Sequence, residues 1–169
     1  PGSVDIELEL VALEEETGDL EAGLEQLRTE RDATERTLRA NLGERKPAFC
    51  SAEGRAMLAF ADSQTLEAVI AAGLVPRTPR TDVDPRNLVR ALEQVRAQGY
   101  SMEDEQSEMG MRSLAAPIRD AEGRVVAAVG IAGPMQRLSD DAIARFAPLV
   151  VNTANVISAR LGFRSPAAF

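Results

Sequence analysis

The sequence predicts an α+β domain in which helices pack against an antiparallel sheet. Three patterns lead to this fold class: capped helical segments before residue 100, two apolar strand-like segments joined by a turn, and a long amphipathic segment after Ser139. Helices and an antiparallel hairpin in this order are typical of such domains. A chain of 169 residues is long enough to bury one substantial core.

Three helices are expected between residues 47 and 99. Ser51 is a suitable N-cap for the first, over Ala52–Phe60, and Gly73 can end the second, over Ser63–Ala72. The third, between Asp84 and Gly99, has the clearest ends. Its N-cap aspartate is followed by a proline in the first turn, and a glycine stops it.

Two strands and a long helix are expected after residue 100. Leu114–Ile118 and Arg124–Ala132 are apolar, and the loop 120–123 between them predicts a hairpin, although Pro117 makes the first strand imperfect. The helix begins after Ser139. Its apolar stripe consists of Ile143, Phe146, Val150, Ala154, Ile157 and Leu161, and Gly162 follows as a stop.

The first part of the chain is acidic and locally helical. In Val4–Glu16 the residue types and the following Gly18 favour a helix. Leu20–Asn41 is interpreted locally as a polar helix, because glutamate and arginine recur in it at helical-turn spacing.

The residue inventory excludes several classes of enzyme and metal site. The chain has no histidine, and Cys50 is its only cysteine. Nucleophiles relayed through imidazole, Cys/His zinc sites and disulfides are therefore ruled out. The phosphate-binding patterns G-x-x-x-x-G-K-[ST] and G-x-G-x-x-G are absent as well. We predict no catalytic residue, no metal, no cofactor and no enzymatic activity; acid–base chemistry by Glu53, Glu103 or Glu105 is the enzymatic alternative.

Charge and hydropathy narrow the choice of partners. The net charge of −8 predicts repulsion from phosphates, so DNA is not an expected partner of this chain alone. No apolar run approaches the ~20 residues that cross a bilayer, and no secretory leader opens the chain. A cytoplasmic location without membrane contact is the resulting expectation.

Five segments between Gly43 and Gly162 stand in an order and spacing typical of one family. They are KPAFCSAEGRAMLA from Lys46, GLVPRTPRT from Gly73, LEQVRAQGYS from Leu92, GMRSLAAPIRD from Gly110, and a last group made of Gly123, Val126–Gly130, Gly133-Pro134 and RLS from Arg137. Together they resemble the C-terminal effector-binding domain of IclR-type bacterial transcription regulators. No single segment is specific, but the combination is.

The resemblance implies a fold, partners and a function. The fold would be a GAF/PAS-like curved antiparallel sheet enclosing a small-molecule pocket, with helices packed on it. The ligand would be a small organic or aromatic acid that modulates DNA binding by an N-terminal winged helix-turn-helix, which is absent from this chain. Self-association to a dimer or tetramer is implied too. A free-standing GAF-like signalling or interaction module without DNA binding is the alternative.

One departure from the family pattern lies before Pro47. Family members usually carry a two-stranded hairpin there, whereas this chain has only a short polar stretch. Either a strand has been lost or one is missing from the sequence, and in the second case Gln26–Glu30 and Glu35–Ala40 are strands. We favour strands, because tertiary context often overrides local propensity. Residues 1–42 are thus an acidic helix with an irregular or partly missing strand region, and residues 43–169 are the effector-binding core of the same domain.

The resemblance also implies which residues of this chain would contact the ligand. The loop that opens the first conserved helix matches Ala52 and Glu53, whose backbone amides could attract a carboxylate; an ordinary capped helix is the alternative. The matching strand positions are Glu103, Ser113, Gly130 and Ala132. Ser113 offers a hydroxyl donor, whereas for Glu103 a solvated surface acid, and for Gly130 and Ala132 close strand packing, are the alternatives.

Several other residues could lie either in the pocket or in the core. Phe49 and Met57 could line the pocket or be plain core residues, and Cys50 is expected in the core or near the pocket. Arg112 and Arg137 could pair with an anionic ligand, but more often such arginines hold surface carboxylates. The small side chains at Gly130 and Ala132 favour a ligand larger than a two- or three-carbon acid, such as an aromatic acid.

Overall fold

The computed structural model describes residues 22, 24–26, 28–29 and 45–164. The chain divides into two units, Pro1–Arg45 and Lys46–Phe169. In the first unit residues 22, 24–26 and 28–29 are helical. Arg28 pairs with Glu25 at 3.5 Å, and the hydroxyl of Thr29 donates to the Glu25 carbonyl at 2.9 Å. At these positions the strand prediction for Gln26–Glu30 is wrong and local helical propensity prevails. Val4–Glu16 and Glu35–Ala40 lie outside the described residues.

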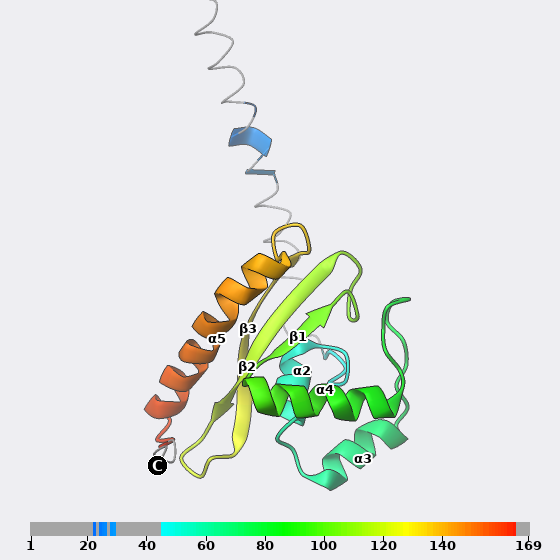
Figure 1. Ribbon diagram of the computed structural model, residues 1–169, viewed down its shortest axis with the longest axis vertical. Helices are drawn as coiled ribbons and strands as arrows, with labels where there is room; N and C mark the ends of the chain where they lie inside the picture. The colour runs from blue at the N-terminus through cyan, green and yellow to red at the C-terminus, as the bar shows by residue number, and fades with distance from the viewer. Residues whose placement is uncertain (1–21, 23, 27, 30–44, 165–169) are drawn as a thin grey trace, which may run out of the picture. The chain divides into compact units, whose positions relative to one another are not determined.

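The second unit confirms the predicted α+β class. Its sheet is antiparallel, with strand order β1-β2-β3 among the described residues. The elements, shown in Figure 1, are α2 (Ala52–Leu58), α3 (Ser63–Ala71), α4 (Pro85–Gln98), β1 (Ser101–Asp104), β2 (Met111–Arg119), β3 (Val125–Pro134) and α5 (Asp140–Arg160). Local pattern had indicated only β2 and β3, and both strands are longer than expected.

The helix ends follow the predicted capping residues. The Asp84 carboxylate accepts from the Arg86 amide at 2.8 Å, and Gly99 ends α4 in the left-handed region at φ 82°. Ser139 caps α5 by accepting from the Ala142 amide at 3.3 Å. The first helix is shorter than expected, since α2 ends at Leu58 rather than at Phe60.

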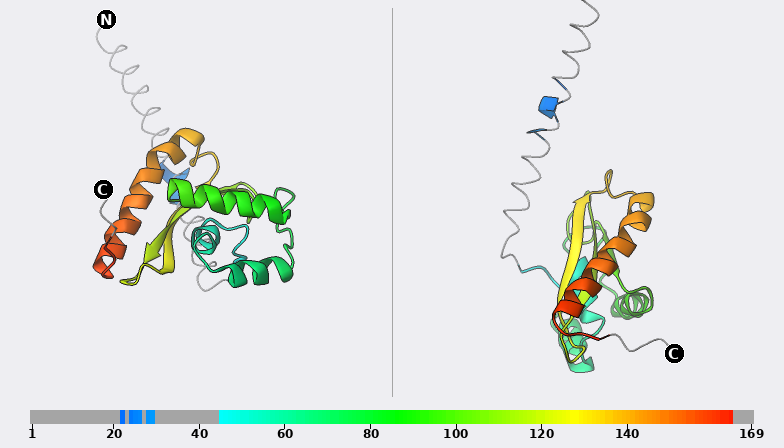
Figure 2. Two further views of the ribbon diagram at one scale, coloured as in Figure 1. Left: turned by 60° about the horizontal axis from the view of Figure 1, so that its bottom comes forward. Right: turned by 90° about the vertical axis from the view of Figure 1, so that its left-hand side faces the viewer.

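The two faces of the sheet pack against different helices (Figures 1 and 2). On one face α5 covers Leu114, Ala116 and Ile118 with a stripe that includes Ile143 and Val150. On the other face α2 lies on the sheet, where a second group consists of Ala52, Ala56, Ala115 and Ala128. A third cluster, with Phe49, Cys50 and Leu92 fully or nearly buried, joins the α2 region to α4.

Helix α5 differs in two respects from its sequence prediction. Leu161, the expected last member of the stripe, is 49% exposed, because it lies beyond the end of the helix. By length and composition alone α5 is also long and apolar enough to cross a membrane, so the expectation that no segment reaches that threshold was wrong. The core helix of a globular domain passes the same test, and the buried stripe of α5 on the sheet accounts for its composition.

Candidate ligand-binding site

The strand register brings the predicted strand residues onto one face of the sheet. Glu103 of β1 lies opposite Ser113 of β2, and Ser113 lies opposite Ala132 of β3. Gly130 lies opposite Ala115, two residues from Ser113 on the same face. This is the face that α2 covers through Ala52. We call the first turn of α2 together with these strand positions the α2–sheet site.

Glu103 is a buried carboxylate that holds the β1–β2 connection. It is only 1% exposed. One of its oxygens accepts from the amides of Gln106 at 2.5 Å and Ser107 at 2.7 Å, and the other accepts from the Ser113 hydroxyl at 3.1 Å. The alternative of a solvated surface acid is therefore wrong. The Ser113 hydroxyl already donates its hydrogen bond to Glu103. Towards a ligand the Ser113 oxygen can therefore act as an acceptor, and not as the donor that was expected.

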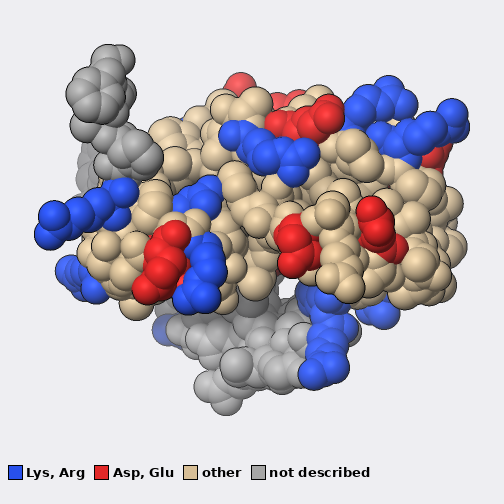
Figure 3. Space-filling model, turned by 90° about the horizontal axis from the view of Figure 1, so that it is seen from below, with Lys and Arg blue, Asp and Glu red and all other residues tan. Residues whose placement is uncertain are grey.

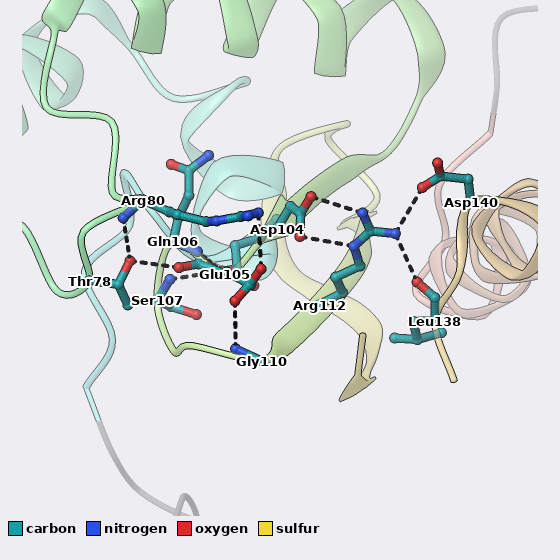
Figure 4. Close-up of polar contacts among 11 residues, drawn as sticks. Thr78, Arg80, Asp104, Glu105, Gln106, Ser107, Gly110, Arg112, Leu138 and Asp140 are labelled. Carbon is teal, nitrogen blue, oxygen red and sulfur yellow. Dashed lines mark hydrogen bonds and ion pairs between the residues drawn. The ribbon is translucent and has the colours of Figure 1, made fainter. Parts of the chain in front are cut away.

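Further hydrogen bonds and an ion pair, which involve Thr78, Arg80 and Glu105, also stabilise the connection between β1 and β2 (Figure 4). Glu105 has a φ of 54°, which is uncommon for a residue with a side chain. Its carboxylate accepts from the Gly110 amide at 2.9 Å and pairs with Arg80 at 2.9 Å. The Thr78 hydroxyl donates to the Glu105 carbonyl at 2.6 Å. The carboxylates of Glu103 and Glu105 thus both make structural hydrogen bonds, which disfavours the alternative that they act as acid–base groups of an enzyme.

The first turn of α2 leaves backbone donors uncommitted. The Ser51 hydroxyl accepts from the Gly54 amide at 3.3 Å and donates to the Pro47 carbonyl at 3.0 Å. The amides of Ala52 and Glu53 precede the first intrahelical bonds and have no acceptor among the described residues. Ala52 is fully buried, whereas Glu53 is partly exposed.

The remaining predicted residues divide between core and surface. Phe49 and Cys50 belong to the core cluster beside α4, and burial raises the pKa of the Cys50 thiol. Met57 is 39% exposed and is therefore not a core residue. Ala132 is exposed at the end of β3.

Gly130 is packed too closely to accept a side chain. A Cβ atom there would lie 2.6 Å from the Leu114 carbonyl oxygen and 2.9 Å from the Ala115 Cβ. This agrees with the close-packing alternative. A phenylalanine at this position could not be accommodated in the folded sheet, so Gly130 is not a position at which the α2–sheet site can be blocked.

Comparison with known proteins identifies the family of this domain. Residues 11–159 match the family model described as the C-terminal domain of the bacterial transcriptional regulator IclR. The chain belongs to the IclR family. The match covers most of the chain, and it is the C-terminal part of these regulators, without the helix-turn-helix, that is matched.

Curated relatives of this IclR domain are transcriptional repressors. The chain is 39% identical over 130 residues to the HTH-type transcriptional repressor AllR of Salmonella paratyphi A, covering 76% of the chain and 48% of that protein. AllR of Escherichia coli K12 is 38% identical over 127 residues, covering 75% of the chain and 47% of that protein. The chain thus spans about half the length of these relatives, which are regulators and not enzymes.

Solved structures of the family share the fold. The repressor BlcR of Agrobacterium tumefaciens matches with a TM-score of 0.69 at 33% identity, over 73% of this chain and 50% of that one. The C-terminal domain of E. coli KdgR has a TM-score of 0.66 at 31% identity, over 72% and 74% of the two chains. The inducer-binding domain of a PobR double mutant from Acinetobacter, in complex with 3-hydroxybenzoic acid, has a TM-score of 0.64 at 29% identity, over 69% and 67%.

Arg55 is a buried residue of this IclR domain that sequence reasoning missed. It projects from α2 and is 6% exposed. Its Nε donates to the Phe49 carbonyl at 2.6 Å, and one terminal nitrogen donates to the Gln106 side chain at 2.5 Å. Arginine is mostly found at the surface, and no feature of the local sequence distinguishes this one from its exposed neighbours.

Arg112 holds acidic side chains of the domain itself. Its guanidinium makes two bonds of 2.9 Å to Asp104 and one of 2.8 Å to Asp140 (Figure 4). The hydrogen bonds from Arg112 lower the pKa of Asp104, and those to Asp104 and Asp140 raise the pKa of Arg112. This confirms the alternative in which the arginine pairs with carboxylates of the chain.

Charged side chains of both signs lie on the surface of the domain. Acidic and basic side chains are interspersed on the face shown in Figure 3 and form no single-sign patch there. Within the described part of the chain, no three His, Cys, Asp or Glu side chains are grouped as a metal ion would require.

Proposed function

We propose that this chain is the effector-sensing domain of a bacterial transcription regulator and binds a carboxylic acid in the α2–sheet site. In the complete protein, which would act in the cytoplasm, occupancy of the site would change DNA binding by a preceding winged helix-turn-helix. The observation that carries the proposal is the convergence of Glu103, Ser113 and Ala132 on the sheet face covered by α2. Coupling of this kind requires two states that differ in ligand affinity.

The lining of the site favours a hydroxylated aromatic acid. Ala132 is exposed and has a small apolar side chain, which leaves room for a ring next to Ser113. The amides at the start of α2 can donate to the carboxylate. The Ser113 hydroxyl donates to Glu103, so its oxygen can accept a hydrogen bond from a ligand hydroxyl. The 3-hydroxybenzoic acid bound by the PobR domain has both groups.

Titration calorimetry with matched ligands and variants tests this proposal. We expect 3-hydroxybenzoate to bind and its neutral analogue 3-hydroxybenzamide to bind at least about tenfold more weakly, because charge-assisted hydrogen bonds are the stronger ones. Ala132→Phe fills the site and should abolish binding. Val126→Phe, at the other, exposed end of β3, should leave it unchanged. Equal affinity for acid and amide, or equal effects of the two phenylalanines, would contradict the proposal.

A further inference from the structure

A cavity separate from the α2–sheet site lies between α4 and β1. Its volume is about 290 Å³, close to the lower limit for small-molecule sites. None of the predicted site residues lines it. Its lining includes the apolar residues Ala91, Val95 and Met102 and the polar residues Arg55, Gln94 and Ser101.

Ser101 brings an unsatisfied hydroxyl to this cavity. The residue has no exposed surface, and its Oγ has no hydrogen-bond partner. Among the described residues, it is the only buried side-chain oxygen or nitrogen atom that has no hydrogen-bond partner. Leaving such a group unpaired costs about 1–3 kcal/mol, and groups of this kind in native proteins usually have an external partner. A ligand oxygen in the cavity would supply that partner.

Arg55, a buried cation, also lines this cavity. No carboxylate of the described residues forms an ion pair with it, and its Nη1 has no acceptor among them. Burial lowers the pKa of Arg55. The nearby Glu103 is already bonded to two backbone amides and to Ser113. Glu103 and Asp82 attract the Arg55 charge without bonding to it directly, so an anion that accepts from Nη1 would add a charge-assisted hydrogen bond.

We infer that this cavity binds a short 2-hydroxy carboxylic acid, with the carboxylate on Arg55 Nη1 and an oxygen of the ligand hydrogen-bonded to Ser101. The carbon chain would lie against Ala91, Val95 and Met102. The inference rests on the cavity, on the Ser101 hydroxyl without a partner and on the Arg55 Nη1 without an acceptor, and it does not depend on the function proposed above.

The test is an NMR titration of the 169-residue chain with 2-hydroxybutyrate and with its neutral amide. We expect saturable shifts at the amides of Gln98, Ser101 and Met102 with the acid and none with the amide. Ser101→Ala removes the hydroxyl without leaving a new unsatisfied group. It should weaken binding about tenfold, the loss expected for one hydrogen bond to a charged ligand, without lowering the melting temperature. Ser63→Ala, at the exposed start of α3, is the matched control and should bind as the wild type does.

Two outcomes would overturn this inference. One is the absence of saturable shifts at these amides, or equal shifts with acid and amide. The other is unchanged binding in Ser101→Ala. Arg55→Lys, which keeps the charge but shortens the reach and removes the planar guanidinium, should also weaken binding. Ser101→Ala should still bind 3-hydroxybenzoate, so failure at this cavity can be told apart from failure at the α2–sheet site.

Discussion

At the scale of single residues, Glu103 is expected to matter more for stability than any exposed acid. Glu103→Ala leaves the amides of Gln106 and Ser107 unpaired and should lower the free energy of unfolding by about 2–3 kcal/mol. Glu103→Gln retains an acceptor oxygen and should cost about 1 kcal/mol or less. Denaturant unfolding of both variants measures this, and equal losses would show that the hydrogen bonds are not the cause.

Asp104 should make stability depend on pH in the acid range. Its pKa in the folded state lies below the ordinary value of 3.8 because Arg112 donates to it. The contribution is therefore fully present above about pH 4 and is lost as the pH falls through the folded-state pKa. Asp104→Asn should lower stability near neutral pH, with the difference from wild type shrinking towards low pH. Parallel curves for the two proteins down to low pH would contradict this assignment.

The site residues show what sequence reasoning can and cannot supply. The positions Glu103, Ser113, Gly130 and Ala132 were predicted through a family resemblance, and the strand register places them on one face. The direction of the Ser113 hydroxyl was not predictable, because it depends on where the Glu103 carboxylate lies. Arg55 was missed for a related reason, since its burial results from packing of α2 against distant residues such as Gln106.

At the scale of elements, Ser158 links α5 to the end of β2. Its hydroxyl accepts from the Arg119 amide at 2.9 Å and donates to the Ala154 carbonyl at 2.7 Å. Ser158→Ala should cost about 1–2 kcal/mol, because the Arg119 amide loses its partner. Thr153→Ala is the control, since Thr153 makes the same kind of bond within the helix, at an exposed position and without a contact to the sheet. Similar losses in both variants would remove Ser158 from this role.

Elements with local end signals were predictable, and elements defined by pairing were not. Helices α4 and α5 were expected from Asp84, Gly99 and Ser139, which cap them as predicted. Strand β1 has only four residues and is held by pairing with β2, so its own sequence carries little signal. Pro117 is tolerated within β2 because it lies beyond the pairing with β1, where β2 pairs with β3 alone.

At the scale of the whole molecule, we predict self-association through the outer face of α5. Leu149 and Val156, seven residues apart on this helix, are 58% and 45% exposed, and an exposed apolar stripe of this kind is typical of an interface. Light scattering should show species larger than the 18.1 kDa chain, and Leu149→Glu with Val156→Glu should shift them towards monomer. A monomer alone at high protein concentration would contradict this prediction.

The central claim is that the domain senses a carboxylic acid with a ring, and a melting-temperature comparison tests it most directly. At a concentration ~100-fold above Kd, a ligand stabilises the folded state by about 2.7 kcal/mol, which for a domain of this size raises the melting temperature by roughly 5–10 °C. We predict such a shift with 3-hydroxybenzoate, a smaller one in Ser113→Ala, and little with glyoxylate or pyruvate. A shift with glyoxylate or pyruvate, and none with aromatic acids, would contradict the account.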